Sequence, residues 1–167
     1  HLIDQALKNP NINFIGCEPY INGVATLLSE IERHSINNIC IFNDDVRLLL
    51  KKLRRSSIDK IFLLFNDPWP KKRHNSRRLI CSETLDELSK IMANGSQIFV
   101  ASDDMNLIRS TLNLFYCHHN FFWLANNPDD WKKRYSDSIA TRYENKAISA
   151  GKDCIYLSFT HKKKNYI

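Results

Sequence analysis

Short apolar runs alternate with amphipathic segments along the chain, and this alternation constrains the fold more than any other feature of the sequence. Parallel strands cannot be joined by a tight turn, so a repeated strand–helix pattern indicates crossover connections. Runs that are apolar throughout, such as residues 61–65 (IFLLF), are typical of strands covered on both faces. The pattern predicts an α/β fold with a mostly parallel sheet and helices on both faces.

The expected elements follow one another in a regular order. The predicted strands are 13–17, 38–42, 60–65, 97–101, 120–124 and 154–159. The predicted helices are 2–8, 21–34, 46–53, 78–92 and 105–116, with a weaker helical pattern near 140–150. Because no convincing helix separates the last two strands, we expect an antiparallel pair at that edge of the sheet. The length of 167 residues suits a single domain over 1–167.

The net charge of +6 favours a polyanionic partner, although a solvated basic surface explains it equally well. The longest apolar runs are too short to cross a bilayer, and no basic-then-apolar leader is present, so we expect a cytoplasmic protein. The five cysteines include no CxxC pair. They predict reduced, buried thiols.

The chain begins inside an amphipathic segment, residues 1–9 (HLIDQALKN), and it contains only four glycines. No glycine-rich loop precedes the first predicted strand. Such loops approach the cofactor closely in nucleotide-binding α/β folds. We therefore expect that the N-terminal portion of the protein is missing from this chain.

Acidic residues follow four consecutive predicted strands. They are Glu18, Asp44 with Asp45, Asp67, and Asp103 with Asp104. Because ligands of open α/β sheets bind beyond the carboxyl ends of the strands, four such acids predict a binding site. Two of the positions have another interpretation, since an Asp directly before a helix is a favoured N-cap.

Residues 65–74 read FNDPWPKKRH and leave the third predicted strand. The two prolines bias Asp67 and Trp69 toward extended geometry, which predicts a stiff loop that holds the Asp67 carboxylate in place. A rigid turn with Trp69 packed over the sheet edge is the structural alternative. The cations that follow suit phosphate groups.

Residues 65–79 (FNDPWPKKRHNSRRL) resemble the signature of the tRNA (guanine-N7)-methyltransferase family. Further motifs of that family have counterparts here in the same order: GCE at 16–18, NDD at 43–45, ASD at 101–103 and TRYE at 141–144. The departures are Asn66, Arg142 and Tyr143, where the family usually has Pro, Lys and Phe.

The resemblance implies a class I, Rossmann-like methyltransferase fold and S-adenosylmethionine-dependent methylation of N7 of a guanine in the variable loop of tRNA. It also implies that the first strand and its glycine loop, which form part of the cofactor site in that family, are missing from this chain. It implies that Glu18 binds the cofactor ribose and that Asn43 and Asp44 lie by the adenine. Asp67 would lie between cofactor and guanine as the catalytic carboxylate. The implied substrate contacts are Lys71, Asp103, Thr141, Arg142, Tyr143 and Glu144. The phosphate contacts expected from the basic segment are Lys72, Arg73, Arg77 and Arg78.

Three other functions agree less well with the sequence. Amino-methyltransferases of adenine or cytosine have adjacent prolines in this loop, whereas Trp69 separates them here. A non-catalytic RNA-binding remnant or fragment of such an enzyme stays the alternative, because it agrees with the missing glycine loop, although it has no need of the strand-end acids. A nicotinamide-dependent dehydrogenase has no use for the basic loop. A metal is not expected, because His118 and His119 have no third ligand at suitable spacing. Both a monomer and a homodimer are compatible with the sequence.

Overall fold

The computed structural model describes residues 1–163, with every side chain except that of Lys72. The chain divides into two compact units. The first comprises residues 1–52 with 137–139, and the second comprises 53–136 with the remainder of the chain from residue 140. The expectation of a single domain over 1–167 stays a prediction.

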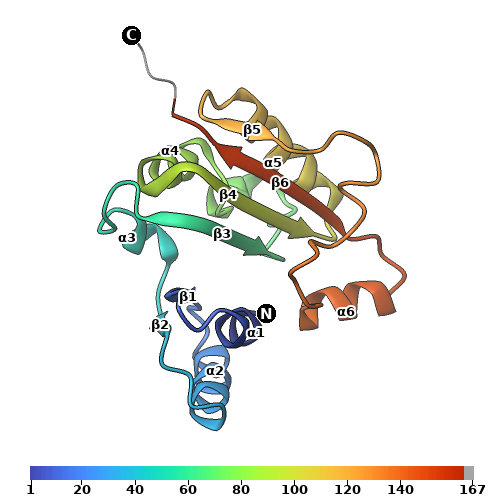
Figure 1. Cartoon of the computed structure of the whole chain (residues 1–167). Coiled ribbons are helices and arrows are strands. Elements are labelled where there is room, and N and C mark those ends of the chain that lie inside the picture. The colour runs from blue at the N-terminus through green and yellow to red at the C-terminus, as the bar shows by residue number, and fades with distance from the viewer. Residues whose placement is uncertain (164–167) are drawn as a thin grey trace. The chain divides into compact units, whose positions relative to one another are not determined.

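The first unit contains α1 (Leu2–Lys8), β1 (Phe14–Cys17), α2 (Ile21–Arg33), β2 (Ile39–Phe42) and α3 (Val46–Leu50). β1 and β2 pair in parallel, with Cys17 opposite Phe42 (Figure 1). Gly16 allows α1 to pack closely, because a Cβ at this position would lie 2.5 Å from the Leu2 side chain. The Asn38 side-chain amide donates to three carbonyls between Ala6 and Ile12, which ties the end of α1 to the start of β2.

The second unit contains a four-stranded sheet in the order β3-β4-β6-β5. Its elements are β3 (Ile58–Leu64), the 3-10 helix η1 (Lys72–Arg77), α4 (Ser82–Ile91), β4 (Met92–Ser102), α5 (Met105–Cys117), β5 (Phe121–Trp123), α6 (Arg142–Ser149) and β6 (Ile155–His161). β3 and β4 are parallel, and β6 lies antiparallel between β4 and β5 (Figure 1). Three of the four strands therefore share one direction.

One face of this sheet carries the core. Phe115 of α5 stacks on Phe159 of β6 with ring centroids 4.1 Å apart, and its edge meets Phe121. Ser89 of α4 bonds to the buried His161 on the same face. Each large apolar side chain buried in this way stabilises the fold by about 1.5–3 kcal/mol.

Tyr135 packs on the opposite face of the sheet, against Phe99, with ring centroids 4.4 Å apart. Its hydroxyl donates to the carbonyls of Val100 and Leu157. The long polar segment between β5 and α6 is thus anchored to the centre of the sheet.

The predicted order of strands and helices is confirmed, while several ends differ. The predicted helix 78–92 begins only at Ser82, because η1 occupies 72–77 and Arg78 is extended at φ −60° and ψ 135°. The expected antiparallel pair at one edge of the sheet is present as β6 and β5, and β6 also pairs antiparallel with β4. β4 starts earlier than predicted, at Met92, and Gly95 adopts φ +83° within it.

The prediction of buried thiols is wrong for three cysteines. Cys17, Cys40 and Cys117 are exposed, and all five thiols are free. Cys17 and Cys40 lie on one face of the β1–β2 ladder together with Ile15, which is 43% exposed. An apolar run predicts strand structure, but it does not specify which face is covered.

Among residues 1–163, no helix has both the length and the apolar character that a bilayer crossing requires.

Candidate active site

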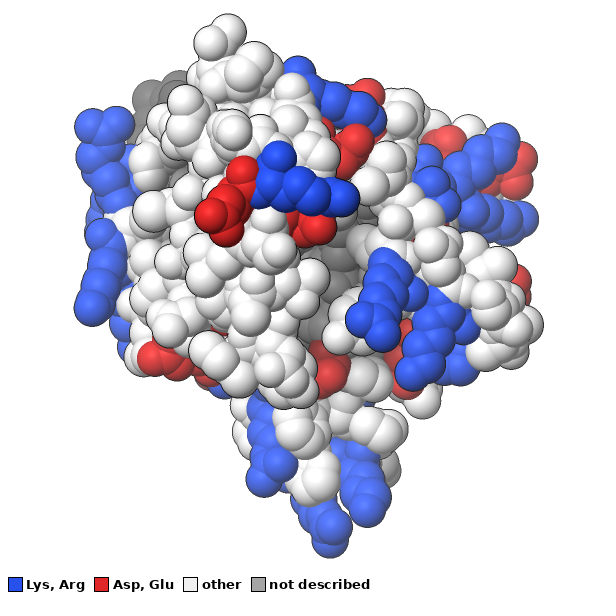
Figure 2. All heavy atoms as spheres, turned by 90° about the horizontal axis from the view of Figure 1, so that it is seen from below, with Lys and Arg blue, Asp and Glu red and all other residues white. Residues whose placement is uncertain are grey.

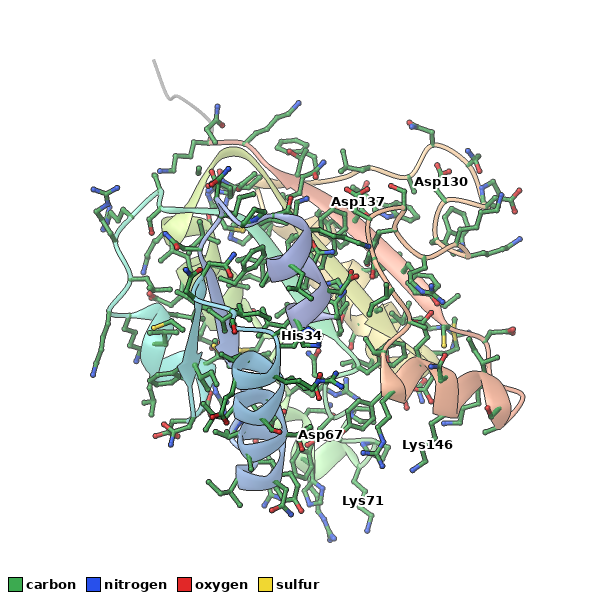
Figure 3. All side chains as sticks on the ribbon, turned by 60° about the horizontal axis from the view of Figure 1, so that its bottom comes forward. His34, Asp67, Lys71, Asp130, Asp137 and Lys146 are labelled. Atoms are coloured by element: carbon green, nitrogen blue, oxygen red, sulfur yellow. The ribbon has the colours of Figure 1, made fainter. Side chains whose placement is uncertain are left out.

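Asp67 and Asp103 follow neighbouring parallel strands of the second unit and leave the sheet at the same end. Leu64 of β3 pairs with Ala101 of β4, and the Phe65 N–H donates to the Ala101 carbonyl at 2.7 Å. The Asp67 side chain is exposed, and no ion pair or hydrogen bond joins its carboxylate to the side chains that the structure describes. Figure 3 shows Asp67 and Lys71 on the segment that follows β3. The carboxylate is therefore accessible to a ligand.

The two adjacent acids after β4 have different partners. Asp104 caps α5 by accepting the backbone N–H of Leu107 at 2.7 Å. Asp103 does not cap the helix, and its carboxylate accepts a hydrogen bond from Lys152 Nζ at 2.6 Å. This hydrogen bond raises the pKa of Lys152, which stays cationic. The end of β4 thus presents a carboxylate paired with an ammonium group.

Two residues of this segment have left-handed backbone geometry, one directly before the loop from Asn66 to Pro70 and one within it. Phe65 has φ 54° and Trp69 has φ 43°. The expectation that Trp69 is extended is therefore wrong. Such angles are rare for aromatic residues and cost of the order of 1–3 kcal/mol each, so the surrounding contacts must hold them.

Arg78 supplies those contacts to the backbone. Its guanidinium donates from Nε to the Pro68 carbonyl at 2.9 Å and, at the long limit of 3.5 Å, from Nη2 to the Trp69 carbonyl. Nη1 donates to the Ser110 hydroxyl of α5 at 3.1 Å. The predicted phosphate contact of Arg78 stays a prediction, and in the structure its donors serve the loop.

The Trp69 ring is held by the helix that follows it. Arg77 Cζ lies 4.9 Å from the ring centroid, a cation–π distance, and His74 meets the ring edge-on with centroids 5.6 Å apart. Lys71 and Arg73 are exposed beside this packed ring, whereas the side chain of Lys72 lies outside those that the structure describes. Figure 2 shows exposed lysine and arginine side chains in several groups on the face that it draws.

In the first unit, Glu18 and Asn43 follow paired positions of β1 and β2. The Glu18 N–H donates to the Phe42 carbonyl at 3.1 Å, which extends the ladder by one residue. Glu18 Oε1 accepts from the Tyr20 N–H at 2.9 Å. A Cβ on Gly23 would lie 2.8 Å from Glu18 Cδ, so the absence of a side chain there makes the space that the carboxylate occupies.

Of the two acids after β2, the second caps a helix and the first does not, as is also the case after β4. Asp45 caps α3 by accepting the Arg47 N–H at 2.9 Å and also pairs with the Arg47 guanidinium. Asp44 accepts only the next backbone N–H, that of Asp45, at 2.7 Å. Asn43 and Asp44 are both exposed, so their oxygen atoms are available to a ligand.

The TRYE segment starts α6. Thr141 and Glu144 form a reciprocal capping box, and the Glu144 side chain is 1% exposed. Its Oε1 accepts from Arg134 Nε at 2.7 Å and from the Tyr156 hydroxyl. Burial raises the pKa of Tyr156, so the hydroxyl stays protonated and donates. The predicted substrate contact of Glu144 stays a prediction, while Arg142 and Tyr143 are exposed at the start of the helix.

Sequence comparison identifies the family. Residues 1–157 match a family model described as "Putative methyltransferase". The chain is 46% identical over 159 residues to a tRNA (guanine-N(7)-)-methyltransferase of Roseobacter denitrificans, covering 95% of this chain and 68% of that protein. This chain belongs to that methyltransferase family. An enzyme of the same name from Rhodospirillum rubrum is 40% identical, with 98% of this chain and 64% of the relative covered, so the chain spans about two thirds of the length of these relatives.

Solved structures with little sequence similarity confirm the class I methyltransferase fold. An rRNA methylase from Streptococcus thermophilus superposes with a TM-score of 0.59 at 10% identity, covering 90% of this chain and 74% of that one. A precorrin-6y C5,15-methyltransferase from Geobacter metallireducens gives a TM-score of 0.61 at 11% identity, covering 96% and 72%. The fold predicted from the resemblance is therefore correct.

S-adenosylmethionine is the methyl donor of this class, and the first unit fits two of its parts. Glu18 offers a carboxylate in a space that a Cβ on residue 23 would fill, which suits the paired hydroxyls of a ribose. Asn43 and Asp44 offer exposed oxygen atoms that suit an adenine amino group. That these residues meet Asp67 and Asp103 around one ligand stays a prediction.

The buried hydrogen-bond network around Glu144 was not predicted from the sequence. The T-x-x-E spacing at 141–144 is the pattern of a capping box, and it could have predicted the internal role of Glu144. No pattern marked Arg134 or Tyr156 as the partners of that carboxylate. Among the described residues, no group of three His, Cys, Asp or Glu side chains is arranged to hold a metal ion.

Proposed function

We propose that this chain forms the catalytic part of an enzyme that methylates N7 of a guanine in tRNA, in the variable loop, with S-adenosylmethionine as donor. The relatives with 40–46% identity bear the name of this activity. The observation that carries the proposal is the Asp67 carboxylate, which is exposed at the end of β3 on a loop fixed by Arg78. The enzyme would act in the cytoplasm, as a monomer or a homodimer.

The chemistry of guanine N7 explains why a carboxylate suits this position. N7 carries an in-plane lone pair and no proton, so no base has to remove a proton before the methyl group arrives. The guanine ring becomes cationic as N7 is methylated. Asp67 would accept hydrogen bonds from the N1 and N2 edge of guanine and balance this charge. When bound, S-adenosylmethionine supplies the activated methyl group.

Positioning is the larger part of the proposed catalysis. Fixed orientation of reacting groups can lower a barrier by about 7–11 kcal/mol, whereas one hydrogen bond to a charged group contributes about 1.5–3 kcal/mol. The strained backbone at Phe65 and Trp69 and the contacts that hold it support such preorganisation around Asp67.

The exposed cations near this loop would bind the tRNA backbone. Lys71 and Arg73 are exposed on the segment that follows Pro70, and Arg142 is exposed at the start of α6. Contacts of this kind are independent of base sequence and weaken with salt. The other residues of the proposed substrate site are Asp103, Thr141, Tyr143 and Glu144. Among these, Glu144 is buried. Lys72 and Arg77 are proposed as further phosphate contacts.

The test is Asp67→Asn and Asp67→Ala in the natural full-length protein, assayed for methyl transfer to tRNA. We expect the rate to fall at least about 100-fold, with thermal unfolding unchanged. Asp59→Asn is the matched control, because Asp59 is also exposed on β3 but near its other end. Near-normal transfer by Asp67→Ala would refute the role. Absence of transfer by the wild-type protein, with tRNA binding retained, would support the non-catalytic RNA-binding alternative.

A further inference from the structure

We infer that Arg78 is a positioning residue that holds the Asp67 loop against helix α5, and that it does not bind tRNA phosphates. The inference rests on the proposed function for its catalytic consequence. The structural part, an arginine that orders the loop, stands on contacts within the second unit alone. It separates Arg78 from the other cations of residues 71–78, which look equivalent in the sequence.

All three nitrogen atoms of the Arg78 guanidinium have acceptors within the protein. Nε and Nη2 point at the carbonyls of Pro68 and Trp69, and Nη1 points at Ser110 Oγ. The Ser110 hydroxyl donates to the Leu107 carbonyl at 2.9 Å, so its lone pair is directed to Arg78. A phosphate would have to compete with these acceptors for a side chain that is already half-buried.

The backbone of the loop offers few other groups for hydrogen bonds. Pro68 and Pro70 have no N–H, so the backbone of this short stretch can be fixed mainly through its carbonyl groups. A planar guanidinium can bond two successive carbonyls and a third acceptor at once, and a lysine ammonium has no such fixed fork. The left-handed Trp69 is therefore held from both sides, by Arg78 on its carbonyl and by Arg77 on its ring.

The same side chain links the two strand ends that carry the acids. Ser110 belongs to α5, whose N-terminus is capped by Asp104, directly after Asp103. Arg78 thus joins the loop with Asp67 to the helix whose N-cap, Asp104, directly follows Asp103. Loss of Arg78 is expected to loosen the position of Asp67 relative to Asp103.

The experiment compares Arg78→Ala and Arg78→Lys with Arg73→Ala and Arg109→Ala in the full-length protein. For Arg78→Ala we expect kcat to fall about 10- to 100-fold while the slope of log tRNA affinity against log salt is unchanged. For Arg73→Ala, an exposed cation of η1, the slope should decrease by about 0.7–0.9. Arg109 is exposed on α5, and its removal should leave kcat as in the wild type. Added guanidinium ion should restore part of the Arg78→Ala rate, and Arg78→Lys should stay slow.

A second readout does not depend on activity. In a background where every other tryptophan of the full-length protein is replaced by Phe, including Trp123 and Trp131 of this chain, only Trp69 emits. Arg78→Ala should then increase quenching of Trp69 by acrylamide, as should Arg78→Lys if Arg78→Ala does not fold. Unchanged quenching would overturn the inference even if the wild type proved inactive on tRNA. A lowered salt slope with unchanged kcat would also overturn it and assign Arg78 to phosphate binding.

Discussion

Asp104 accepts a hydrogen bond from the backbone N–H of Leu107 at 2.7 Å, so Asp104 caps the helix and Asp103 does not. Asp45 caps α3 in the same way. In each Asp–Asp pair the second carboxylate caps the helix and the first does not. Capping is therefore assigned to Asp45 and Asp104, and ligand binding by Asp44 and Asp103 stays a prediction.

Removal of the cap should cost stability, whereas removal of the preceding acid should not. Asp104→Ala is expected to lower the free energy of unfolding by about 0.5–2 kcal/mol, since the N–H of Leu107 loses its acceptor. Asp103→Ala should change it by less than about 0.5 kcal/mol, because its partner Lys152 is exposed. Urea unfolding of both variants measures the difference. Equal losses would contradict this division of roles.

The buried Glu144 should matter for stability beyond any contact with substrate. Glu144→Ala removes the acceptor of Arg134 and Tyr156 and one half of the capping box, and it should cost about 1–3 kcal/mol. Arg142→Ala, at an exposed position of the same helix, is the control and should stay within about 0.5 kcal/mol. Chemical denaturation of the two variants tests this, and a neutral Glu144→Ala would refute the buried network.

Gly23→Ala should separate cofactor affinity from stability. A Cβ would meet Glu18 Cγ and Cδ at 2.8 Å, and these atoms belong to a flexible side chain that can move away. Folding should be unaffected or improved, because Ala favours a helix by about 0.5–1 kcal/mol over Gly. The displaced carboxylate should weaken S-adenosylmethionine binding by roughly 10- to 100-fold, which corresponds to the loss of one charged hydrogen bond. Calorimetry with the full-length protein measures this, and unchanged affinity would argue against Glu18 as the ribose ligand.

Stability should fall as the medium becomes acidic through the histidine range. Burial lowers the pKa of His161, whose Nδ1 donates to the Ala93 carbonyl and whose Nε2 accepts from Ser89. Since the unfolded chain has a histidine pKa of about 6.5, it binds the proton more readily than the folded chain, and stability present above that pH is lost below it. Burial also lowers the pKa of His118, which acts in the same direction. His161→Gln should flatten the profile of urea midpoint against pH, and an equally steep profile would assign the effect to other groups.

Salt should reveal which cations meet the tRNA backbone. Neutralising Lys71 and Arg73 together should reduce the log–log salt slope of tRNA binding by about 1.4–1.8. The matched control neutralises Lys8 and Lys90, which are paired with Asp4 and Glu87 on their own helices. Filter binding over a salt series provides the slopes. Identical slopes for both double variants would mean that η1 does not bind phosphates.

The sequence predicted the elements well because strand and helix periods differ clearly. It singled out Asp67 because an Asp followed by a Trp between two prolines is uncommon and belongs to a family signature, and the role of Asp67 stays a prediction. It could not assign the role of Arg78, because its guanidinium donates to backbone carbonyls. Every residue has such a carbonyl, so no sequence pattern marks these acceptors. It also missed the reversed backbone of Trp69, since the bias of a proline on its neighbour is weaker than the contacts made by Arg77 and Arg78.

The reversed direction of β6 determines which of its flanking residues lie beside the end of β4. In parallel strands, only residues that follow the strand reach the ligand side of the sheet, but β6 brings the residues that precede it to that side. Lys152 arrives in this way and meets Asp103. A change in the length or charge of the connection ahead of β6 would therefore alter the surroundings of Asp103 and leave the hydrogen-bonded β4–β6 ladder unchanged.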